Sequence, residues 1–359
     1  MDSVDLYQAA GGRGVCRQLS EAFYARVERD PVLRPLFPGK SMRCAVEAFT
    51  AFLAQFLGGP AEDAQARWWL SLRQSHSRFK IGWRERQAWM SNMIEALEDV
   101  PIDEPVRFAL RDLFERSSAY MVNSGEALHG PAAAEDPSDG RIHHEIAQRW
   151  TEQLAVDDLA AAIHTGDASR ALELTQSPTL RDRFARDRAV FAHVLGLMMG
   201  CGGDGVMEYA ERELLADPAL ANIRSRYGRT LLHDAAAYGN LRMVELLLRL
   251  GADPNAGTAG GHTPLYSVAN ECQVTGGGSI VRALIRAGAQ VNVPCGAKRC
   301  TALHMAARRG NTEVAEALVE CGAAIDARDK TGDTPLRRAK NCRKAGVASL
   351  LVSRGATER

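Results

Sequence analysis

The chain has 359 residues, of which 46% are hydrophobic and 25% charged, as in ordinary globular proteins. Lysine plus arginine and aspartate plus glutamate number 44 each, so no basic surplus favours nucleic acid or an anionic membrane as a partner. None of the eight cysteines forms a Cys-x-x-Cys pair, which disfavours a zinc site and fits a reducing compartment. Because we find no secretory leader and no apolar run of membrane length, we expect a cytoplasmic protein.

Residues 1–124 form the first predicted domain, because their apolar residues recur at helical spacing without strand-like alternation. Several motifs follow in order: Gly11-Gly12, EAFYARV from Glu21, DPVLRPLFP from Asp30, FLAQFLGGP from Phe52, LRQSHSRFKIG from Leu72 and ERQAWM from Glu85. This ordered set resembles the truncated haemoglobins of the second group. The resemblance implies an all-α fold, the two-on-two helical sandwich of the truncated globins, with haem b as cofactor.

His76 stands where the resemblance implies the proximal ligand of the haem iron. It is the only histidine in the first 124 residues, and a globin holds its iron through one proximal imidazole. Phe79 follows it as in the family, although Arg78 occupies a position where family members often have proline. We therefore expect His76 to be the metal ligand and Phe79 to lie beside the haem.

The same residue-by-residue comparison implies a distal side with two hydrogen-bond donors. Tyr24 matches the family's distal tyrosine, and Trp89 matches the tryptophan that marks the second group, so both would donate to O2 or another diatomic gas. Phe37 stands where many members have tyrosine or histidine, which removes a third donor. Ala45 occupies the place of the distal histidine of ordinary globins, with Phe49 one turn further on, so we expect five-coordinate ferrous iron.

Two basic residues, Arg73 and Lys80, flank His76 in the sequence. Cations in this position either pair with the haem propionates or are solvated surface charges. The sequence leaves both alternatives open.

Residues 125–141, GEALHGPAAAEDPSDGR, predict a flexible linker, because they are rich in Gly, Pro, Ala, Asp and Ser and have no apolar period. For residues 142–224 we expect short helices with Gly-containing turns, as degenerate copies of the repeat that follows them. Residues 159–167 predict the first helix and turn of one copy. Residues 189–215 predict another, whose Gly-rich turn at 200–205 lacks the Lys-Ser/Thr of a phosphate-binding loop.

Residues 225–359 contain one tetrapeptide in four variants, TLLH, TPLY, TALH and TPLR, which begin at Thr230, Thr263, Thr301 and Thr334. Their first residues are 33, 38 and 33 positions apart. Each is followed by two short helices around a turn and then by Gly-Ala. The pattern resembles ankyrin repeats, with their period of about 33 residues and T-P-L-H-x-A signature. It implies a solenoid of five or six repeats, degenerate at its start, that binds a protein partner.

The repeat pattern carries structural expectations of its own. Each Thr hydroxyl would accept a hydrogen bond from an amide in the first turn of the following helix. His233 and His304 would hydrogen-bond the backbone of a neighbouring hairpin rather than a metal. The extra residues around 272–278 lengthen the loop between two helices, either as a tolerated insertion or as part of a partner-specific surface.

Three functions are compatible with these features. The leading one is a haem protein that binds O2, NO or CO reversibly, while the repeats sense its ligand state or carry it to a protein partner. The second is a haem enzyme, an NO dioxygenase or peroxidase-like protein, which would need an external reductase because the chain has no flavin or nicotinamide domain. The third is an interaction protein whose globin domain has lost haem, which the presence of His76, Tyr24 and Trp89 disfavours.

Overall fold

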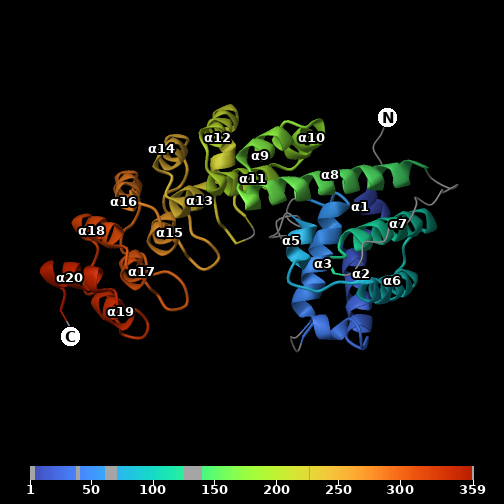
Figure 1. Ribbon diagram of the computed structural model, residues 1–359, viewed down its shortest axis with the longest axis horizontal. Coiled ribbons are helices and arrows are strands. Elements are labelled where there is room, and N and C mark those ends of the chain that lie inside the picture. The colour runs from blue at the N-terminus through green and yellow to red at the C-terminus, as the bar shows by residue number, and fades with distance from the viewer. Residues whose placement is uncertain (1–4, 38–40, 61–70, 125–139, 226, 358–359) are drawn as a thin grey trace. The chain divides into compact units, whose positions relative to one another are not determined.

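Helices are the only regular elements among the residues that the computed structural model describes, which are 5–37, 41–60, 71–124, 140–225 and 227–357 (Figure 1). The one extended pairing in that part of the chain is an isolated antiparallel bridge between Cys295 and Cys300. The expected all-α fold is therefore confirmed. By its internal contacts the chain divides into two units, residues 1–161 with 174–183 and residues 162–173 with 184–359.

The first unit is built around α2, which packs against α1, α3 and α6, while α6 also packs against α7. Gly11 and Gly12 have φ values of 86° and 66°, a conformation that favours glycine, and they allow the tight turn between α1 and α2. The Glu85 carboxylate accepts a hydrogen bond from the Gly82 amide at 2.9 Å at the start of α6. The helices before α8 are α1 (Leu6–Ala9), α2 (Gly12–Val27), η1 (Arg34–Leu36), α3 (Arg43–Phe56), α5 (Leu72–His76), α6 (Trp83–Glu98) and α7 (Glu104–Tyr120).

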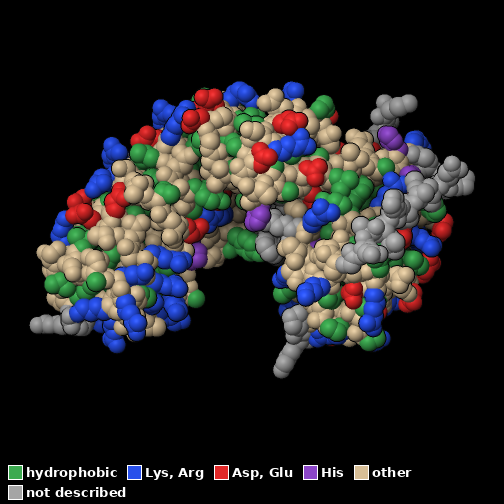
Figure 2. Space-filling model, viewed as in Figure 1, with side chains coloured by type: hydrophobic (Ala, Val, Ile, Leu, Met, Phe, Trp, Pro, Cys, Tyr) green, Lys and Arg blue, Asp and Glu red, His purple; other side chains and the backbone are tan. Residues whose placement is uncertain are grey.

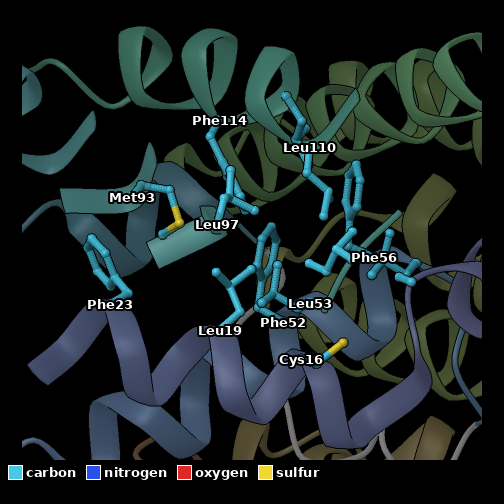
Figure 3. Packing of buried hydrophobic residues seen from close by; sticks show 14 of the residues in the cluster. Cys16, Leu19, Phe23, Phe52, Leu53, Phe56, Met93, Leu97, Leu110 and Phe114 are labelled. Carbon is cyan, nitrogen blue, oxygen red and sulfur yellow. The ribbon is translucent and has the colours of Figure 1, made fainter. Parts of the chain in front are cut away.

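Apolar side chains from these helices meet in one buried core (Figure 3). Helices α2, α6 and α7 contribute residues spaced mainly three or four positions apart, so that one face of each is apolar and turns inward. The core thus joins segments that are distant in the sequence. Its members include Cys16, Leu19, Phe23, Phe52, Leu53, Phe56, Met93, Leu97, Leu110 and Phe114.

Helix α8 (Gly140–Thr165) is longer than the sequence analysis expected. Instead of short helices from residue 142 onward, the structure has one helix of 26 residues. No Gly or Pro interrupts residues 141–165. Ile142, Ile146 and Trp150, spaced four apart, are buried in the core of the first unit, and Arg149 donates to the Phe56 carbonyl at 3.1 Å. Residues up to 161 therefore belong to the first compact unit. Of the expected linker, residues 125–139 lie outside the described part, and the last two residues begin α8.

In the described residues of the second unit, five helix pairs are stacked in order. The first helices of successive pairs pack against one another, α11 on α13, α13 on α15, α15 on α17 and α17 on α19, and the second helices form a parallel series. The pairs are α11 (Arg188–Cys201) with α12 (Asp204–Ala216), α13 (Leu231–Tyr238) with α14 (Leu241–Arg249), α15 (Pro264–Glu271) with α16 (Gly277–Arg286), α17 (Ala302–Arg309) with α18 (Thr312–Glu320), and α19 (Pro335–Asn341) with α20 (Ala345–Ser353). Between α8 and α11 lie α9 (Ala168–Thr175) and α10 (Pro178–Arg186), and η2 (Pro218–Asn222) follows α12.

Several local expectations for this unit are confirmed. The Gly-rich segment at 200–205 contains the turn between α11 and α12, which is formed by Gly202 and Gly203. The extra residues after Glu271 lengthen the turn between α15 and α16. Thr263 and Thr334 accept hydrogen bonds from the amides of Tyr266 and Arg337, as an N-cap does.

The threonines that precede a histidine behave differently. The hydroxyl of Thr230 lies 2.9 Å from Nδ1 of His233, and that nitrogen also accepts from the Thr230 amide at 3.1 Å. Nε2 of His233 then lies 3.0 Å from the carbonyl oxygen of His262 in the next hairpin. His304 makes the same set of contacts and reaches the carbonyl of Asp333 at 3.0 Å. The expected role of both histidines, bonding hairpin backbone, is confirmed.

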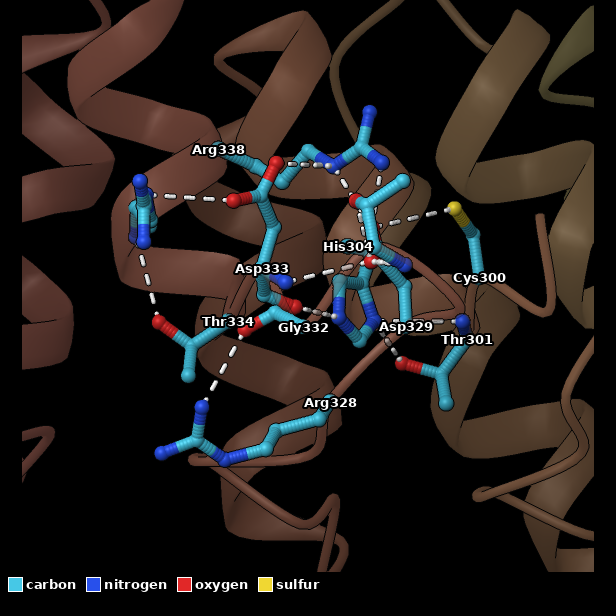
Figure 4. Close-up of polar contacts among 11 residues, drawn as sticks. Cys300, Thr301, His304, Arg328, Asp329, Gly332, Asp333, Thr334 and Arg338 are labelled. Carbon is cyan, nitrogen blue, oxygen red and sulfur yellow. Dashed lines mark hydrogen bonds and ion pairs between the residues drawn. The ribbon is translucent and has the colours of Figure 1, made fainter. Parts of the chain in front are cut away.

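Asp329 organises the last hairpin (Figure 4). Its buried carboxylate accepts from the amide and hydroxyl of Thr331, both at 2.7 Å, and from Nε of Arg338 at 2.9 Å. Although burial opposes the charge, these hydrogen bonds hold the pKa of Asp329 well below its usual value. The carboxylate therefore remains ionised and fixes the turn that receives His304.

Candidate functional site

His76 lies at the last position of α5 with its ring held by the preceding turn. Its Nδ1 is 2.8 Å from the carbonyl oxygen of Leu72 and 2.9 Å from the Ser75 hydroxyl oxygen. Because a carbonyl oxygen can only accept, the proton of a neutral imidazole belongs on Nδ1, and Nε2 carries the lone pair. This is the tautomer that a metal ligand requires.

Aromatic rings connect His76 to the other predicted site residues. The His76 ring centroid is 6.2 Å from that of Phe79, which is 5.7 Å from that of Phe37. Phe37 in turn lies 5.8 Å from Tyr24, and Tyr24 lies 6.3 Å from Phe49. The structure therefore brings together residues from α2, α3, α5 and the segments that follow η1 and α5.

Tyr24 and Trp89 supply the polar groups of this region. Phe23 lies between them, with ring centroids 5.1 Å from each. Burial raises the pKa of Tyr24 above its usual value, so its phenol stays protonated and can donate a hydrogen bond. Neither the Tyr24 hydroxyl nor the Trp89 indole is hydrogen-bonded to another described residue. Both donors are thus available to a ligand.

The remaining predicted residues fall into two groups. Ala45 lies on α3 one turn before Phe49, and both are partly buried. The Arg73 guanidinium lies 4.4 Å from the ring centroid of Tyr120 on α7, and Lys80 is exposed. Ala45 belongs with the aromatic residues because it shares α3 with Phe49. Arg73 stacks instead on the ring of Tyr120, which is not one of the predicted site residues.

Haem fits the residues that are present. The polar groups are the positioned imidazole of His76 and two donors without a hydrogen bond to another described residue, on Tyr24 and Trp89. The neighbouring aromatic rings pack against the core but are only partly buried. Apolar rings left partly exposed next to a core are the surface that a flat hydrophobic group would cover. This region, comprising His76, Tyr24, Phe37, Ala45, Phe49, Phe79 and Trp89, is called the aromatic site below.

One contribution to this region, from α8, is not apparent in the sequence. The carboxylate of Asp157, on α8, accepts hydrogen bonds from the backbone amides of Leu72 and Arg73 at the start of α5. The spacing of Ile142, Ile146 and Trp150 signals a helix with an apolar face. Nothing local to α8 indicates that this face packs on a segment 85 residues earlier in the chain.

Comparison with known proteins agrees with the motifs and the fold. Residues 5–123 match the family described as bacterial-like globin. The group 2 truncated hemoglobin YjbI of Bacillus subtilis (strain 168) is 34% identical over 121 residues, which are 34% of this chain and 90% of that protein. The chain belongs to the group 2 truncated haemoglobins. Its globin domain is followed by a second kind of structure that this relative's match does not cover.

The second unit is similar to ankyrin repeats. Residues 214–265 and 270–358 match ankyrin-repeat families. Ankyrin repeat and SOCS box protein 16 of Homo sapiens is 34% identical over 140 residues, which are 37% of this chain and 30% of that protein. Ankyrin repeat domain-containing protein 63 of Homo sapiens is 31% identical over 131 residues, 34% of this chain and 33% of that protein. The chain thus spans about a third of each of these relatives.

The last repeats carry a basic surface. Figure 2 shows Lys and Arg side chains gathered over α17 and α19. Acidic residues of the same repeats lie on α18, where Glu316 and Glu320 pair with Arg354 and Arg282, and in the last hairpin, where Asp333 pairs with Arg337. The surplus of exposed basic side chains over α17 and α19 attracts acidic groups even in a chain with no net charge. The exposed basic residues of this surface lie on α17, on α19 and in the turns next to them. They are Lys298, Arg299, Arg308, Arg309, Arg328, Lys330, Arg337, Lys340 and Arg343.

No described helix is long and apolar enough to cross a membrane.

Proposed function

We propose that this protein binds haem b through His76, binds O2 or another diatomic gas reversibly, and engages a protein partner through its ankyrin repeats. The protein would act as a gas sensor or localise oxygen or redox chemistry at that partner. The observation that carries the proposal is the hydrogen bond from His76 Nδ1 to the Leu72 carbonyl, which leaves Nε2 as the ligating nitrogen.

The aromatic site assigns a task to each residue. Haem supplies the iron that binds the gas. His76 would hold that iron, and Phe37, Phe49 and Phe79 would cover the faces of the ring and exclude water. Tyr24, which stays protonated because burial raises its pKa, would donate a hydrogen bond to the gas, together with Trp89. Ala45 has no side chain that could ligate iron, so it would leave room for the gas.

Absorption spectroscopy of the purified full chain tests this assignment. We expect a Soret band with one haem per chain, a five-coordinate ferrous spectrum, and a stable complex on adding O2 or CO. His76→Ala should lose the five-coordinate histidine spectrum, while His144→Ala, which changes an exposed histidine of α8, should leave it unchanged. Wild-type protein without a Soret band after reconstitution with haem would instead favour a haem-free interaction protein.

The role of the repeats needs a separate measurement. If they report the ligand state, hydrogen exchange of residues 188–353 should differ between deoxy and CO-bound protein, because coupling requires two states with different ligand affinity. Identical exchange would reduce the repeats to a tether. The basic surface over α17 and α19 suits acidic groups on the partner.

A further inference from the structure

Helix α8 holds the first turn of the helix that carries His76. Asp157 is only 3% exposed. Its Oδ1 accepts from the Leu72 amide at 2.9 Å and its Oδ2 from the Arg73 amide at 3.1 Å. The Gln153 side chain donates to Oδ1 at 2.8 Å. A buried carboxylate is stable only when several donors satisfy it, so this contact is a specific one.

The Arg73 amide and the Leu72 carbonyl are the two ends of one peptide group. The amide end donates to the Asp157 carboxylate, and the carbonyl end accepts from His76 Nδ1 at 2.8 Å. A negative charge at the N–H end polarises the peptide and makes its oxygen a better acceptor. A hydrogen bond that pulls more strongly on the Nδ1 proton makes Nε2 more basic.

Helix α5 depends on this contact for its position. It has five residues, too few for a helix to be stable by itself. Neighbouring rings keep the contact in place: Trp150 of α8 packs edge-on against Tyr120 at 5.7 Å, and Arg73 stacks on the same Tyr120 ring. Burial and the nearby Asp157 charge raise the pKa of Tyr120 to about 12, so its phenol stays neutral beside the carboxylate.

We propose that Asp157 is a positioning residue for His76, which tunes the proximal imidazole through the peptide group between Leu72 and Arg73. The proposal rests on haem ligation by His76 as proposed above. Helix α8 runs on to Thr165, and its residues from Ala162 belong to the second unit. A shift of α8 would therefore alter the donor strength of the proximal ligand.

The test is the iron–histidine stretching band of the deoxy ferrous full chain, measured by resonance Raman spectroscopy. Asp157→Asn removes the charge with little change in shape, so we expect the band to move to lower frequency. We also expect loss of haem to excess apomyoglobin to be about 10-fold faster, the usual effect of removing an outer partner of a metal ligand. Asp158→Asn makes the same charge change at the exposed neighbouring position and should change neither value.

A second variant separates tuning from simple loosening. Gln153→Met removes one donor from the Asp157 carboxylate, which leaves more of its charge for the Arg73 amide. The band should then move to higher frequency, opposite to Asp157→Asn. Shifts in the same direction for both variants would mean that the contact is only structural. If Asp157→Asn fails to fold, the direction of the Gln153→Met shift decides alone, because a shift to lower frequency contradicts tuning. A wild-type band that persists unchanged in Asp157→Asn overturns this proposal alone, whereas absence of the band in wild type overturns haem ligation by His76.

Discussion

The two units differ in how far along the chain their decisive contacts reach. In the repeats, His233 bonds Thr230 three residues before it and the carbonyl of His262 in the adjacent hairpin. In the globin unit, α5, which carries His76, is held by Asp157, 85 residues after Leu72. A stack of repeats is therefore stabilised between neighbours. The aromatic site, by contrast, exists only when the whole unit is assembled.

The largest expected effect comes from truncating one core residue in each unit. Phe114→Ala should lower the free energy of unfolding of the first unit by about 3–5 kcal/mol, and Leu318→Ala that of the repeats by about 2–5 kcal/mol. All five tryptophans lie within residues 1–161, so their fluorescence follows the first unit alone. Far-UV circular dichroism follows both units during urea unfolding.

The site should respond to only one of these changes. Phe114 packs against Phe49 at 6.2 Å and Trp89 at 5.7 Å, so Phe114→Ala should also speed CO release. Leu318→Ala should leave the fluorescence midpoint and the CO kinetics unchanged. A lower fluorescence midpoint in Leu318→Ala would contradict the prediction that the two units unfold independently.

Acid should weaken the repeats through their buried histidines. Burial lowers the pKa of His233 to about 4, and it also lowers the pKa of His304. The unfolded chain, with a histidine pKa of about 6.5, takes up the proton first, so stability is lost as pH falls from about 6.5 to about 4. The loss from His233 is about 3 kcal/mol. The Asp329 carboxylate stays ionised across this range, because its hydrogen bonds hold its pKa in the folded protein well below the usual value.

Urea unfolding followed by circular dichroism between pH 7.5 and 4.5 measures this loss. His233→Gln supplies a matched control, because a Gln three residues after an N-cap Thr can accept from the Thr230 amide without titrating. The variant should lose less stability than the wild type over the same range. An equal loss in both proteins would show that another group titrates there.

These contrasts explain what the sequence could and could not predict. The repeats were predictable because the Thr cap of each repeat, together with the His three residues later and the Gly that ends the first helix in two of them, acts locally. Gly239, for example, takes the positive φ that ends α13. The residues of the aromatic site were predicted from ordered motifs of a known family, and their proposed roles toward haem stay predictions. The fusion of α8 to the globin unit was not predictable, because Ile146 and Trp150 indicate an apolar face without naming its partner.

A smaller effect is expected at the distal side. Tyr24→Phe removes the phenolic donor and keeps the ring contacts with Phe37 and Phe49. Loss of one hydrogen bond of about 1–1.5 kcal/mol should make O2 release roughly 10-fold faster. CO, which carries less negative charge, should be released at nearly the wild-type rate. Stopped-flow measurement of both gases checks the prediction, and equal changes for O2 and CO would mean that Tyr24 acts by packing alone.

The smallest effect separates the two interpretations of Arg73. Its guanidinium stacks on Tyr120, and an exposed cation–π contact contributes about 0.5–1 kcal/mol. Arg73→Met keeps a long apolar stem, so the first unit should lose no more than that, as measured by fluorescence during urea unfolding. If the guanidinium serves only the Tyr120 ring, haem loss to apomyoglobin should stay near the wild-type rate. If it pairs with a propionate instead, haem loss should quicken while stability without haem is unchanged.

Lys80→Met gives the matched comparison, because Lys80 is exposed and follows His76 in the sequence, whereas Arg73 precedes it. A faster loss of haem in Lys80→Met but not in Arg73→Met would assign the propionate contact to Lys80, and would leave Arg73 to the contact between α5 and α7.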